Sequence, residues 1–498
     1  MSQRITQREL ERYLWGASTL LRGMIDAGDY KQYIFPLLFL KRLSDVHAEE
    51  HAAAMAVYED ETLADLPENH RFAIPKGARW EDIRAVTKDR GHAIAGAMRH
   101  IEQANPSTLR GVFGEGDWGN KDLLSDATLG ELIEHFSSRT LSVANLPEDE
   151  LGNGYEFLIK KFADDSGHTA QEFYTNRTLV RLMTQMLQPQ PGESIYDPTC
   201  GTGGMLISAA AEVKDQGKEW RGLRLYGQER NFGTSAIGRM NVFLHGIETS
   251  HIANDDTLVN PVFLDGHGRL QTFDVVLANP PYSIKNWNRE AFASDPYGRN
   301  RWGTPPQGRA DYAFFQHIAA SMDPQTGRAA ILFPHGVLFR REEAEMRWKL
   351  IESDLLECVL GLGPGLFYNS PMEAVVVVLR SRKPAERRSQ VLFINAVNEY
   401  IRRDAQSHLS DSNQKRILSA YRAFEDETGF SAVADTETIL SRDGSLAIPL
   451  YVAGGPGAED ETAAGISLAE AVAAWRRAAE GADEAVTTVL AMLAEEEN

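Results

Sequence analysis

The 498-residue chain is poor in cysteine and contains no long apolar run. Its two cysteines, Cys200 and Cys358, lack the spacing of a zinc site or a disulfide framework, so we expect neither to hold the fold, and we expect no metal. Wholly apolar runs such as residues 374–379 are far too short to cross a bilayer. The first residues lack the apolar core of a signal peptide. These absences predict a protein of the reducing cytoplasm without a membrane partner.

Basic residues are also scarce, with 51 Lys and Arg against 71 Asp and Glu, a net charge of −20. A protein that grips DNA alone usually has a basic surface, because phosphate contacts supply much of the affinity. If this chain acts on DNA, we therefore expect another subunit to provide many of the contacts that bind the DNA. The alternative is that the acidic composition only confers solubility.

A polar and aromatic tetrapeptide follows a buried-strand pattern at residues 273–278. It consists of Asn279, Pro280, Pro281 and Tyr282. Open α/β sheets place their chemistry at strand ends, and the prolines fix the local backbone. The Asn279 amide and the Pro280 carbonyl could accept both hydrogens of a planar amino group, while Tyr282 offers a face to an unstacked base. The motif predicts an amino-group methylation site, and a plain turn is the alternative.

A glycine-rich turn follows an earlier strand that ends at Asp197. The turn contains Gly201, Thr202, Gly203 and Gly204. Glycines let the backbone approach a ligand closely, although a tight strand-to-helix connection is the alternative. No diphosphate-binding Gly-x-Gly-x-x-Gly is present, and Asp197 would repel a diphosphate but could pair with an α-ammonium group. The turn therefore favours S-adenosylmethionine over a dinucleotide.

Two further strand ends carry acidic residues. Glu229 follows a strand at residues 223–228 and suits the ribose hydroxyls of a nucleoside. Asp256 follows the third strand and could accept the exocyclic amine of the cofactor's adenine, with Asp255 as the rival. Four successive β-α units with a polar residue at each strand end are rarer than any single motif. They predict an α/β, Rossmann-like S-adenosylmethionine-dependent methyltransferase domain.

The rest of the chain divides by pattern into three parts. Residues 1–150 predict an N-terminal helical domain, either an interaction or lid domain or a plain bundle. Residues 151–453 contain the methyltransferase domain, in which strands at 329–333, 358–362, 373–379 and 391–394 would complete a sheet of about seven or eight. Residues 454–498 predict a linker and a C-terminal helical tail, which either docks on a partner or packs back.

Two loops complete the candidate site. One precedes an amphipathic helix, with Thr175 or Asn176 as its N-cap, and its helix N-terminus could hold a ligand carboxylate. It consists of Gln171, Glu172, Phe173, Tyr174, Thr175 and Asn176. The other loop, at residues 283–310, interleaves basic and aromatic side chains and predicts a DNA contact, a solvated loop being the alternative. Its candidate DNA-binding residues are Lys285, Arg289, Arg299 and Arg301.

Taken together, these motifs resemble the modification (methyltransferase) subunit of a type I restriction-modification system, an N6-adenine DNA methyltransferase. Their order, with residues 171–176 before the glycine-rich turn and residues 279–282 after it, is similar to the gamma class. The segments 35–43, 310–314 and 333–340 extend the resemblance over most of the chain. Asn176 departs from it, because the family commonly has proline there.

The resemblance implies a function and an assembly. Residues 171–176 and 202–204 would line the S-adenosylmethionine pocket, Glu229 would bind its ribose, and residues 279–282 would hold a flipped adenine. Methyl transfer to the amine would be direct, without a covalent enzyme intermediate. Two such subunits would join one specificity subunit, which reads the DNA sequence, and a restriction subunit can be added. The alternatives are a methyltransferase of another phage-defence system, a protein-glutamine or RNA amino-methyltransferase, and a non-catalytic scaffold.

Overall fold

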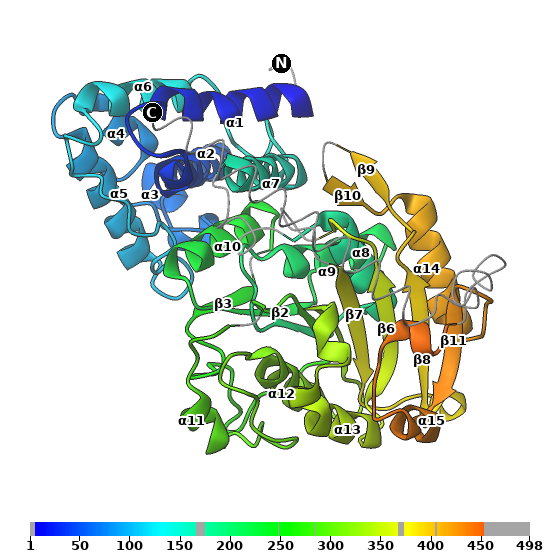
Figure 1. Ribbon diagram of the computed structural model, residues 1–498. Helices are drawn as coiled ribbons and strands as arrows, with labels where there is room; N and C mark the ends of the chain where they lie inside the picture. Colours follow the sequence, from blue (N-terminus) through cyan, green and yellow to red (C-terminus); the bar gives the residue numbers. More distant parts are fainter. Residues whose placement is uncertain are drawn as a thin grey trace, which may run out of the picture.

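A computed structural model describes residues 5–165, 175–247, 249–282, 284–366, 373–403 and 406–452. Residues Gln171 to Tyr174 and the tail at 454–498 lie outside this described part. A group of helices from the N-terminal third lies beside a large twisted sheet with helices on both faces (Figure 1). No described helix is long and apolar enough to span a membrane.

The N-terminal third is helical, as its apolar periodicity predicts. Its helices are α1 (Gln7–Leu21), α2 (Lys31–Tyr58), α3 (Glu61–Ala64), α4 (Trp80–Ala85), α5 (Arg90–Ala104), α6 (Asp126–Ser137) and α7 (Glu148–Asp165). A capping box formed by Thr6 and Glu9 begins α1. Pro36 lies inside the second turn of α2, where its missing amide removes one helical hydrogen bond without ending the helix.

The core of these helices continues into the sheet domain. Tyr155, Leu158 and Phe162 of α7 are buried together with residues of α1 and α2. Ile237 and Met240 of α10 (Phe232–Leu244) belong to the same apolar cluster. The predicted division at residue 150 thus falls inside α7, and the two parts share buried surface.

Nine of the described strands form one sheet in the order β11-β8-β6-β7-β5-β4-β1-β2-β3. They are β1 (Ser194–Asp197), β2 (Arg224–Glu229), β3 (Ser250–Asn254), β4 (Val275–Ala278), β5 (Arg328–Pro334), β6 (Leu356–Leu362), β7 (Ala374–Arg380), β8 (Gln390–Ala396) and β11 (Ser431–Asp435). Strand β7 runs antiparallel to both β5 and β6, and β11 runs antiparallel to β8. Strands β9 (Ile401–Arg403) and β10 (Gln406–His408) form a separate hairpin.

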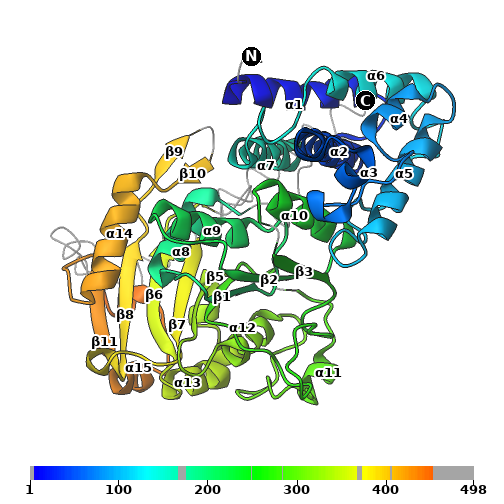
Figure 2. The ribbon, with the colours of Figure 1, turned by 180° about the vertical axis from the view of Figure 1, so that it is seen from behind.

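The two faces of the sheet are covered by different helices. On one face lie α8 (Arg177–Leu187), α9 (Gly204–Asp215), α10 and α14 (Asp411–Ala423); the other carries α11 (Arg289–Ala293), α12 (Asp311–Ser321), α13 (Ala344–Glu352) and α15 (Thr436–Ser441) (Figures 1 and 2). Alternate residues of β4 serve the two cores: Val275 and Leu277 pack with α8 and α9, and Val276 and Ala278 pack with α12. Burial on both faces explains why this strand is continuously apolar.

The strand order reverses between β1 and β4. These neighbours are parallel and pair Ile195 with Val275 and Tyr196 with Val276. The helix that follows β1 lies on one face, while the chain after β4 passes to the other. Such a reversal leaves a crevice outside the carboxyl ends of the two strands, where ligands of open α/β sheets bind. Asp197 and Asn279 both lie at this edge.

The predicted fold class is confirmed, and each predicted strand corresponds to a strand of the sheet. The ranges 329–333, 358–362, 373–379 and 391–394 correspond to β5, β6, β7 and β8. We expected about seven or eight strands, and the sheet has nine in the described residues. The strand of this sheet without a prediction is β11, whose sequence Ser-Ala-Val-Ala-Asp has one β-branched residue and no strand-like apolar run. The hairpin of β9 and β10 was not predicted either.

Candidate functional site

The glycine-rich turn links the end of β1 to α9. Gly201 and Gly203 have φ of +51° and +78°, a left-handed backbone that suits glycine. A Cβ on Gly203 would lie 2.8 Å from Cγ2 of Val242 on α10. Asn241 of the same helix donates from Nδ2 to the Thr202 carbonyl oxygen at 2.8 Å. Helix α10 therefore packs against the turn and holds its backbone in one conformation.

Glu229 joins the turn to the next strand. Its Oε2 accepts a hydrogen bond from the Gly201 amide at 3.1 Å, and its Oε1 accepts one from the Asn231 amide at 2.8 Å. The carboxylate thus lies at the end of β2, beside the turn, as its sequence position predicts. A carboxylate accepts hydrogen bonds from hydroxyl groups as well as from backbone amides.

Asp197 is a buried carboxyl group at the end of β1. Its residue is 2% exposed, and its Oδ1 accepts a hydrogen bond from the Thr199 amide at 3.0 Å. Burial raises the pKa of Asp197 to about 8, and the nearby Glu229 carboxylate adds to this effect. A cation placed beside Asp197 would restore its charged form. The site therefore favours a ligand that carries a positive group.

Asn279 lies at the end of β4 with both ends of its side-chain amide engaged. Its Nδ2 donates to Oγ1 of Thr175 at 3.0 Å, and its Oδ1 accepts a hydrogen bond from the Tyr282 hydroxyl. Thr175 is 104 residues away in the chain and directly precedes the N-cap of α8. The structure thus brings together the two motifs that the sequence could only place in order.

The strand-end crevice fits a polar, cationic nucleoside ligand. Thr199 Oγ1, in the turn itself, is buried without a hydrogen-bond partner among the described residues. Gly203 and Gly204 keep side-chain atoms away from the turn, since a Cβ on either would clash with a neighbour. The buried carboxyl of Asp197 supplies a partner for a positive group, and Glu229 supplies acceptors. Such groups fit the ammonium group and the ribose of S-adenosylmethionine.

Other predicted cofactor residues are held by contacts within the chain. Asn176 is the N-cap of α8 and also donates from Nδ2 to the Ser407 carbonyl oxygen at 2.8 Å, so of the two predicted caps it is Asn176 that is used. Oδ1 of Asp256 accepts from the Leu258 amide at 2.9 Å, and its Oδ2 lies 3.5 Å from Nε of Arg230. Roles for Asn176 and Asp256 in cofactor binding stay predictions.

One predicted DNA contact is wrong. Arg299 is 1% exposed, and its guanidinium lies 2.6 Å from the carboxylate of Asp295, which is also buried. It also donates to the carbonyl oxygens of Thr257 and Leu258, each at 2.9 Å. An arginine that is enclosed and paired in this way holds its loop together and cannot reach a phosphate.

The other three basic residues of this loop are more accessible. Lys285 and Arg301 are exposed, and Arg289 is half-buried with its Nε donating to the Pro305 carbonyl oxygen at 2.8 Å. The loop contains the short helix α11 and a buried Trp302, which is unavailable for stacking on a base. DNA binding by Lys285, Arg289 and Arg301 stays a prediction.

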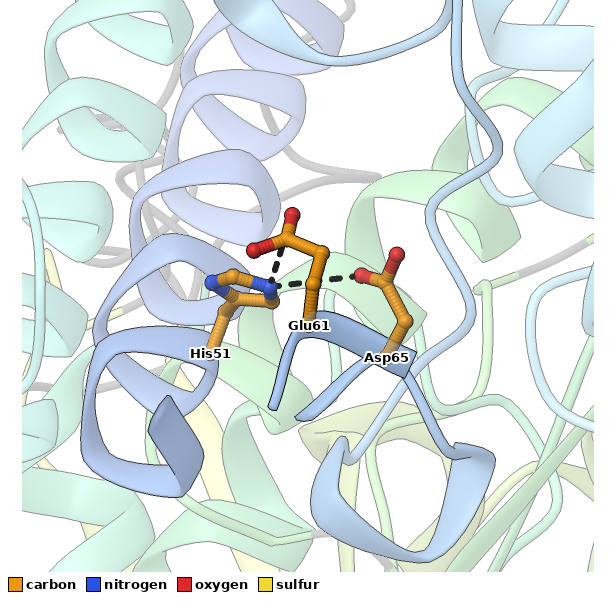
Figure 3. Close-up of side chains that lie close together, drawn as sticks. All are labelled: His51, Glu61 and Asp65. Atoms are coloured by element: carbon orange, nitrogen blue, oxygen red, sulfur yellow. Dashed lines mark ion pairs between the residues drawn. The ribbon is translucent and has the colours of Figure 1, made fainter. Parts of the chain in front are cut away.

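A second group of titratable side chains lies between α2 and α3, away from the sheet (Figure 3). Nε2 of His51 is 3.4 Å from Oδ1 of Asp65 and 3.6 Å from Oε1 of Glu61. The same Asp65 oxygen lies 3.4 Å from the Arg79 guanidinium. The arginine already neutralises this carboxylate, so the group is best described as an ion-pair network that joins the two helices.

The fold is that of an α/β methyltransferase, and the family match identifies the class to which it belongs. The chain belongs to the N-6 DNA Methylase family, which matches residues 147–460, and residues 10–136 match the HsdM N-terminal domain. The chain is therefore an adenine N6 DNA methyltransferase by family, which confirms the predicted enzyme class.

Individual proteins to which the chain is similar indicate which kind of DNA methyltransferase it resembles. The chain is 34% identical over 489 residues to the type I restriction enzyme MjaVIII methylase subunit of Methanocaldococcus jannaschii, covering 92% of this chain and 80% of that one. It is 28% identical over 424 residues to the HindI methylase subunit of Haemophilus influenzae, covering 82% and 89%. The structure of a type I restriction-modification methyltransferase subunit from Streptococcus thermophilus superposes with a TM-score of 0.79 at 30% identity, covering 90% and 100%. The predicted resemblance is confirmed.

The support of the turn by α10 can be tested by adding one methyl group. A Cβ on Gly238 would lie 2.8 Å from the Gly201 carbonyl oxygen, whereas one on Gly233 of the same helix would meet Asn231 Oδ1 at 3.5 Å, an ordinary contact. We expect Gly238→Ala to lower the free energy of unfolding by about 1–3 kcal/mol because backbone must move. Gly233→Ala should leave it unchanged or raise it by up to about 1 kcal/mol, because alanine favours a helix more than glycine does. Urea denaturation of both variants measures this, and equal effects would contradict the close packing.

Proposed function

We propose that this chain methylates N6 of adenine within a specific double-stranded DNA sequence, as the modification subunit of a type I restriction-modification complex, and that the crevice at β1 and β4 is the reaction site. The observation that carries this proposal is the position of Asn279. Its amide lies at the switch point, oriented by Thr175 on one side and Tyr282 on the other. An amide held in this way presents its carbonyl oxygen in a defined direction.

Asn279 and the adjacent backbone act on the target amine. The Asn279 carbonyl has two lone pairs, of which the Tyr282 hydroxyl uses one. The second lone pair and the Pro280 carbonyl accept the two hydrogens of the adenine amino group. These bonds favour the geometry in which the nitrogen lone pair points away from the ring, and they stabilise positive charge that develops on nitrogen during transfer. Burial raises the pKa of Tyr282 well above its usual value, so its hydroxyl stays protonated and keeps donating to Asn279.

Residues at the ends of β1 and β2 would hold the cofactor. Glu229 accepts its ribose hydroxyls, the turn at Gly201 to Gly204 allows close backbone approach, and Asp197 pairs with its α-ammonium group. S-adenosylmethionine, when bound, supplies an electrophilic methyl group. The residues of the crevice hold the two reactants together and exclude water, which converts a bimolecular encounter into an intramolecular one.

Recognition of the DNA sequence belongs to a partner. The net charge of −20 disfavours strong binding of DNA by this chain alone. The relatives are named as subunits of type I restriction enzymes. A specificity subunit would therefore contribute sequence reading and much of the phosphate contact, with two copies of this chain, and a restriction subunit would join the complex. Lys285, Arg289 and Arg301 would add local contacts near the flipped base.

The role of Asn279 is tested by a pair of substitutions. Asn279→Ala removes the acceptor for the target amine, and we expect transfer to fall at least about a hundredfold, as for the loss of other preorganised polar groups. Cofactor affinity, measured by calorimetry, should change less than about threefold, which is under 1 kcal/mol. Tyr282→Phe, which keeps the aromatic face, should lose much less activity. Full activity of Asn279→Ala would rule out the assignment.

The buried carboxyl predicts a pH dependence of cofactor binding. Asp197 has a pKa near 8 without a partner, and an adjacent ammonium group lowers this pKa, so binding releases a proton from Asp197. Affinity for S-adenosylmethionine should therefore rise by up to about tenfold per pH unit between about pH 6 and 7.5, and fall above about 8 as the ligand's amine loses its charge. Calorimetry at several pH values measures this. In Asp197→Asn the rise on the acid side should disappear; a rise that persists in this variant would assign it to another group.

The methyl acceptor is identified by following a tritiated methyl group into bacterial genomic DNA. The chain is assayed alone and together with a co-expressed specificity subunit from a neighbouring gene. We expect labelled N6-methyladenine only when both are present. Label in protein or RNA would replace the proposal with a different acceptor. Bound cofactor without any transfer would indicate a scaffold.

A further inference from the structure

The turn that follows β5 emerges beside the target motif. Strands β4 and β5 are parallel and pair Ala278 with Ile331, so the chain leaves both strands at the same edge of the sheet. The β5 turn, residues 335–343, contains two 3-10 helices, η4 (His335–Leu338) and η5 (Arg341–Glu343). None of its residues has a role in the proposed methyl transfer.

Buried contacts hold the backbone of the β5 turn in place. Val337 and Leu338 are each 1% exposed. The Val337 carbonyl oxygen accepts a hydrogen bond from the Tyr312 hydroxyl at 3.1 Å, and the Leu338 carbonyl oxygen accepts one from the Leu446 amide at 2.9 Å. A turn that is fixed in this way presents its remaining side chains in defined directions.

Arg340 connects the β5 turn to the target motif. Its Nη1 donates to Oδ2 of Asp311, the first residue of α12, at 2.6 Å, and the two side chains are 16% and 1% exposed. Burial raises the pKa of Tyr282, and the charge of Asp311 adds to this effect, as a nearby carboxylate does. The start of α12 therefore lies between Arg340 and Tyr282 and joins the turn to the motif.

Two side chains of the β5 turn face solvent. Phe339 is 48% exposed, and Arg341 is exposed and has no ion pair among the residues that the structure describes. The acidic neighbours are placed differently, because Glu342 lies 3.0 Å from Nη1 of Arg309 and Glu343 is buried. The exposed part of the turn is therefore an aromatic ring followed by a positive charge.

The β5 turn also borders the basic and aromatic loop at residues 283–310. The ion pair of Arg309 with Glu342 joins the end of that loop to the turn. Surfaces that bind nucleic acids combine arginines, which pair with phosphates, and aromatic rings, which stack on bases. Phenylalanine also serves as an apolar wedge between bases of a distorted duplex. Extrusion of an adenine from its stack creates such a gap.

We propose, resting on the proposed function, that Phe339 and Arg341 form a DNA contact beside the reaction site. Phe339 stacks in the gap that the target adenine leaves in the duplex, and Arg341 pairs with a phosphate next to this gap. The ring replaces stacking that the neighbouring bases lose, so it offsets part of the cost of extrusion. The turn thus gives a chain of net charge −20 a local attraction for DNA at the place where the target base leaves the duplex.

The stacking role of Phe339 is tested in the complex of this chain with a co-expressed specificity subunit, on a duplex that contains the sequence this complex methylates. With 2-aminopurine in place of the target adenine, fluorescence rises when that base leaves the stack. We expect Phe339→Ala to reduce this rise and to lower transfer to a paired adenine roughly five- to a hundredfold, as for the loss of other stacked aromatic rings. When the target adenine is mismatched and easily extruded, the loss of transfer should shrink to about threefold or less. Phe339→Trp, which keeps a ring, should retain most of the transfer rate.

The phosphate contact of Arg341 is tested by the salt dependence of DNA binding. Each contact with a duplex phosphate contributes about −0.9 to the slope of log affinity against log salt concentration. In Arg341→Gln this slope should become less steep by about one contact. Fluorescence anisotropy of a labelled duplex, titrated with the complex at several salt concentrations, measures the slope.

Two exposed residues away from the β5 turn are the matched controls. Tyr58, at the end of α2, is 46% exposed, close to the value for Phe339. Arg388 is exposed and precedes β8, which runs in the same direction as β5, so it lies at the opposite edge of the sheet. Tyr58→Ala should keep the fluorescence rise and the transfer rate, and Arg388→Gln should keep the salt slope. Thermal unfolding of each variant shows whether it is folded.

The outcomes separate this inference from the function it rests on. If the unaltered complex methylates DNA and folded Phe339→Ala keeps both the fluorescence rise and the transfer rate, or Arg341→Gln keeps the salt slope, the inference is wrong while the function stands. If Phe339→Ala lowers transfer equally to paired and mismatched adenine, Phe339 has only a structural role. If the unaltered complex methylates no DNA, the proposed function itself fails.

Discussion

The pairing of β1 with β4 is the constraint on which the site depends. The register of Ile195 with Val275 and Tyr196 with Val276 is parallel, so both strands end at the same edge. The turn after β1 and Asn279 after β4 therefore lie close together at this edge. The paired residues Ile195 and Val275 are 80 positions apart in the chain. No local propensity can create this meeting. It comes from burying two continuously apolar strands side by side between two helical layers.

Burial also decides the electrostatics of the crevice. Asp197 is charged in water at neutral pH, yet at the end of a central strand its pKa rises to about 8. The carboxyl is thereby prepared for a cationic partner, since pairing returns the charge that desolvation removed. Arg177 of α8 and Glu156 of α7 show the opposite arrangement, in which the chain supplies both charges of a bidentate pair.

The N-terminal helices pack directly against the elements that form the site. Their apolar core includes Ile237 and Met240 of α10, the helix that supports the glycine-rich turn, and their last helix, α7, supplies Glu156. If these helices moved, packed side chains rather than a linker would therefore transmit the movement to the glycine-rich turn. Figures 1 and 2 show this group on the same side of the sheet as α8, α9 and α10. This placement makes the helical part a physical neighbour of the site.

Sequence reasoning succeeded where a local pattern has one physical meaning. Apolar runs identified most of the strands, and the positive φ of Gly203 agrees with the tight turn that its glycines predicted. The same reasoning failed for Arg299, which stood among basic and aromatic residues typical of a nucleic-acid loop. Asp295, four residues earlier, pairs with it in the interior, and the sequence alone does not distinguish a buried i, i+4 pair from an exposed one. Strand β11 was missed because its pairing with β8, rather than its composition, makes it a strand.

By itself, the sequence determined the class of fold, the order of the motifs and the family, because these depend on residue types and their spacing along the chain. The tertiary structure alone decided which of those residues meet. The bond from Asn279 to Thr175 spans 104 residues, and the pair of Arg177 with Glu156 joins α8 to α7. Contacts of this kind depend on the register of strands and the packing of helices. They arise only when the whole core is assembled, since no short segment of the chain contains both partners.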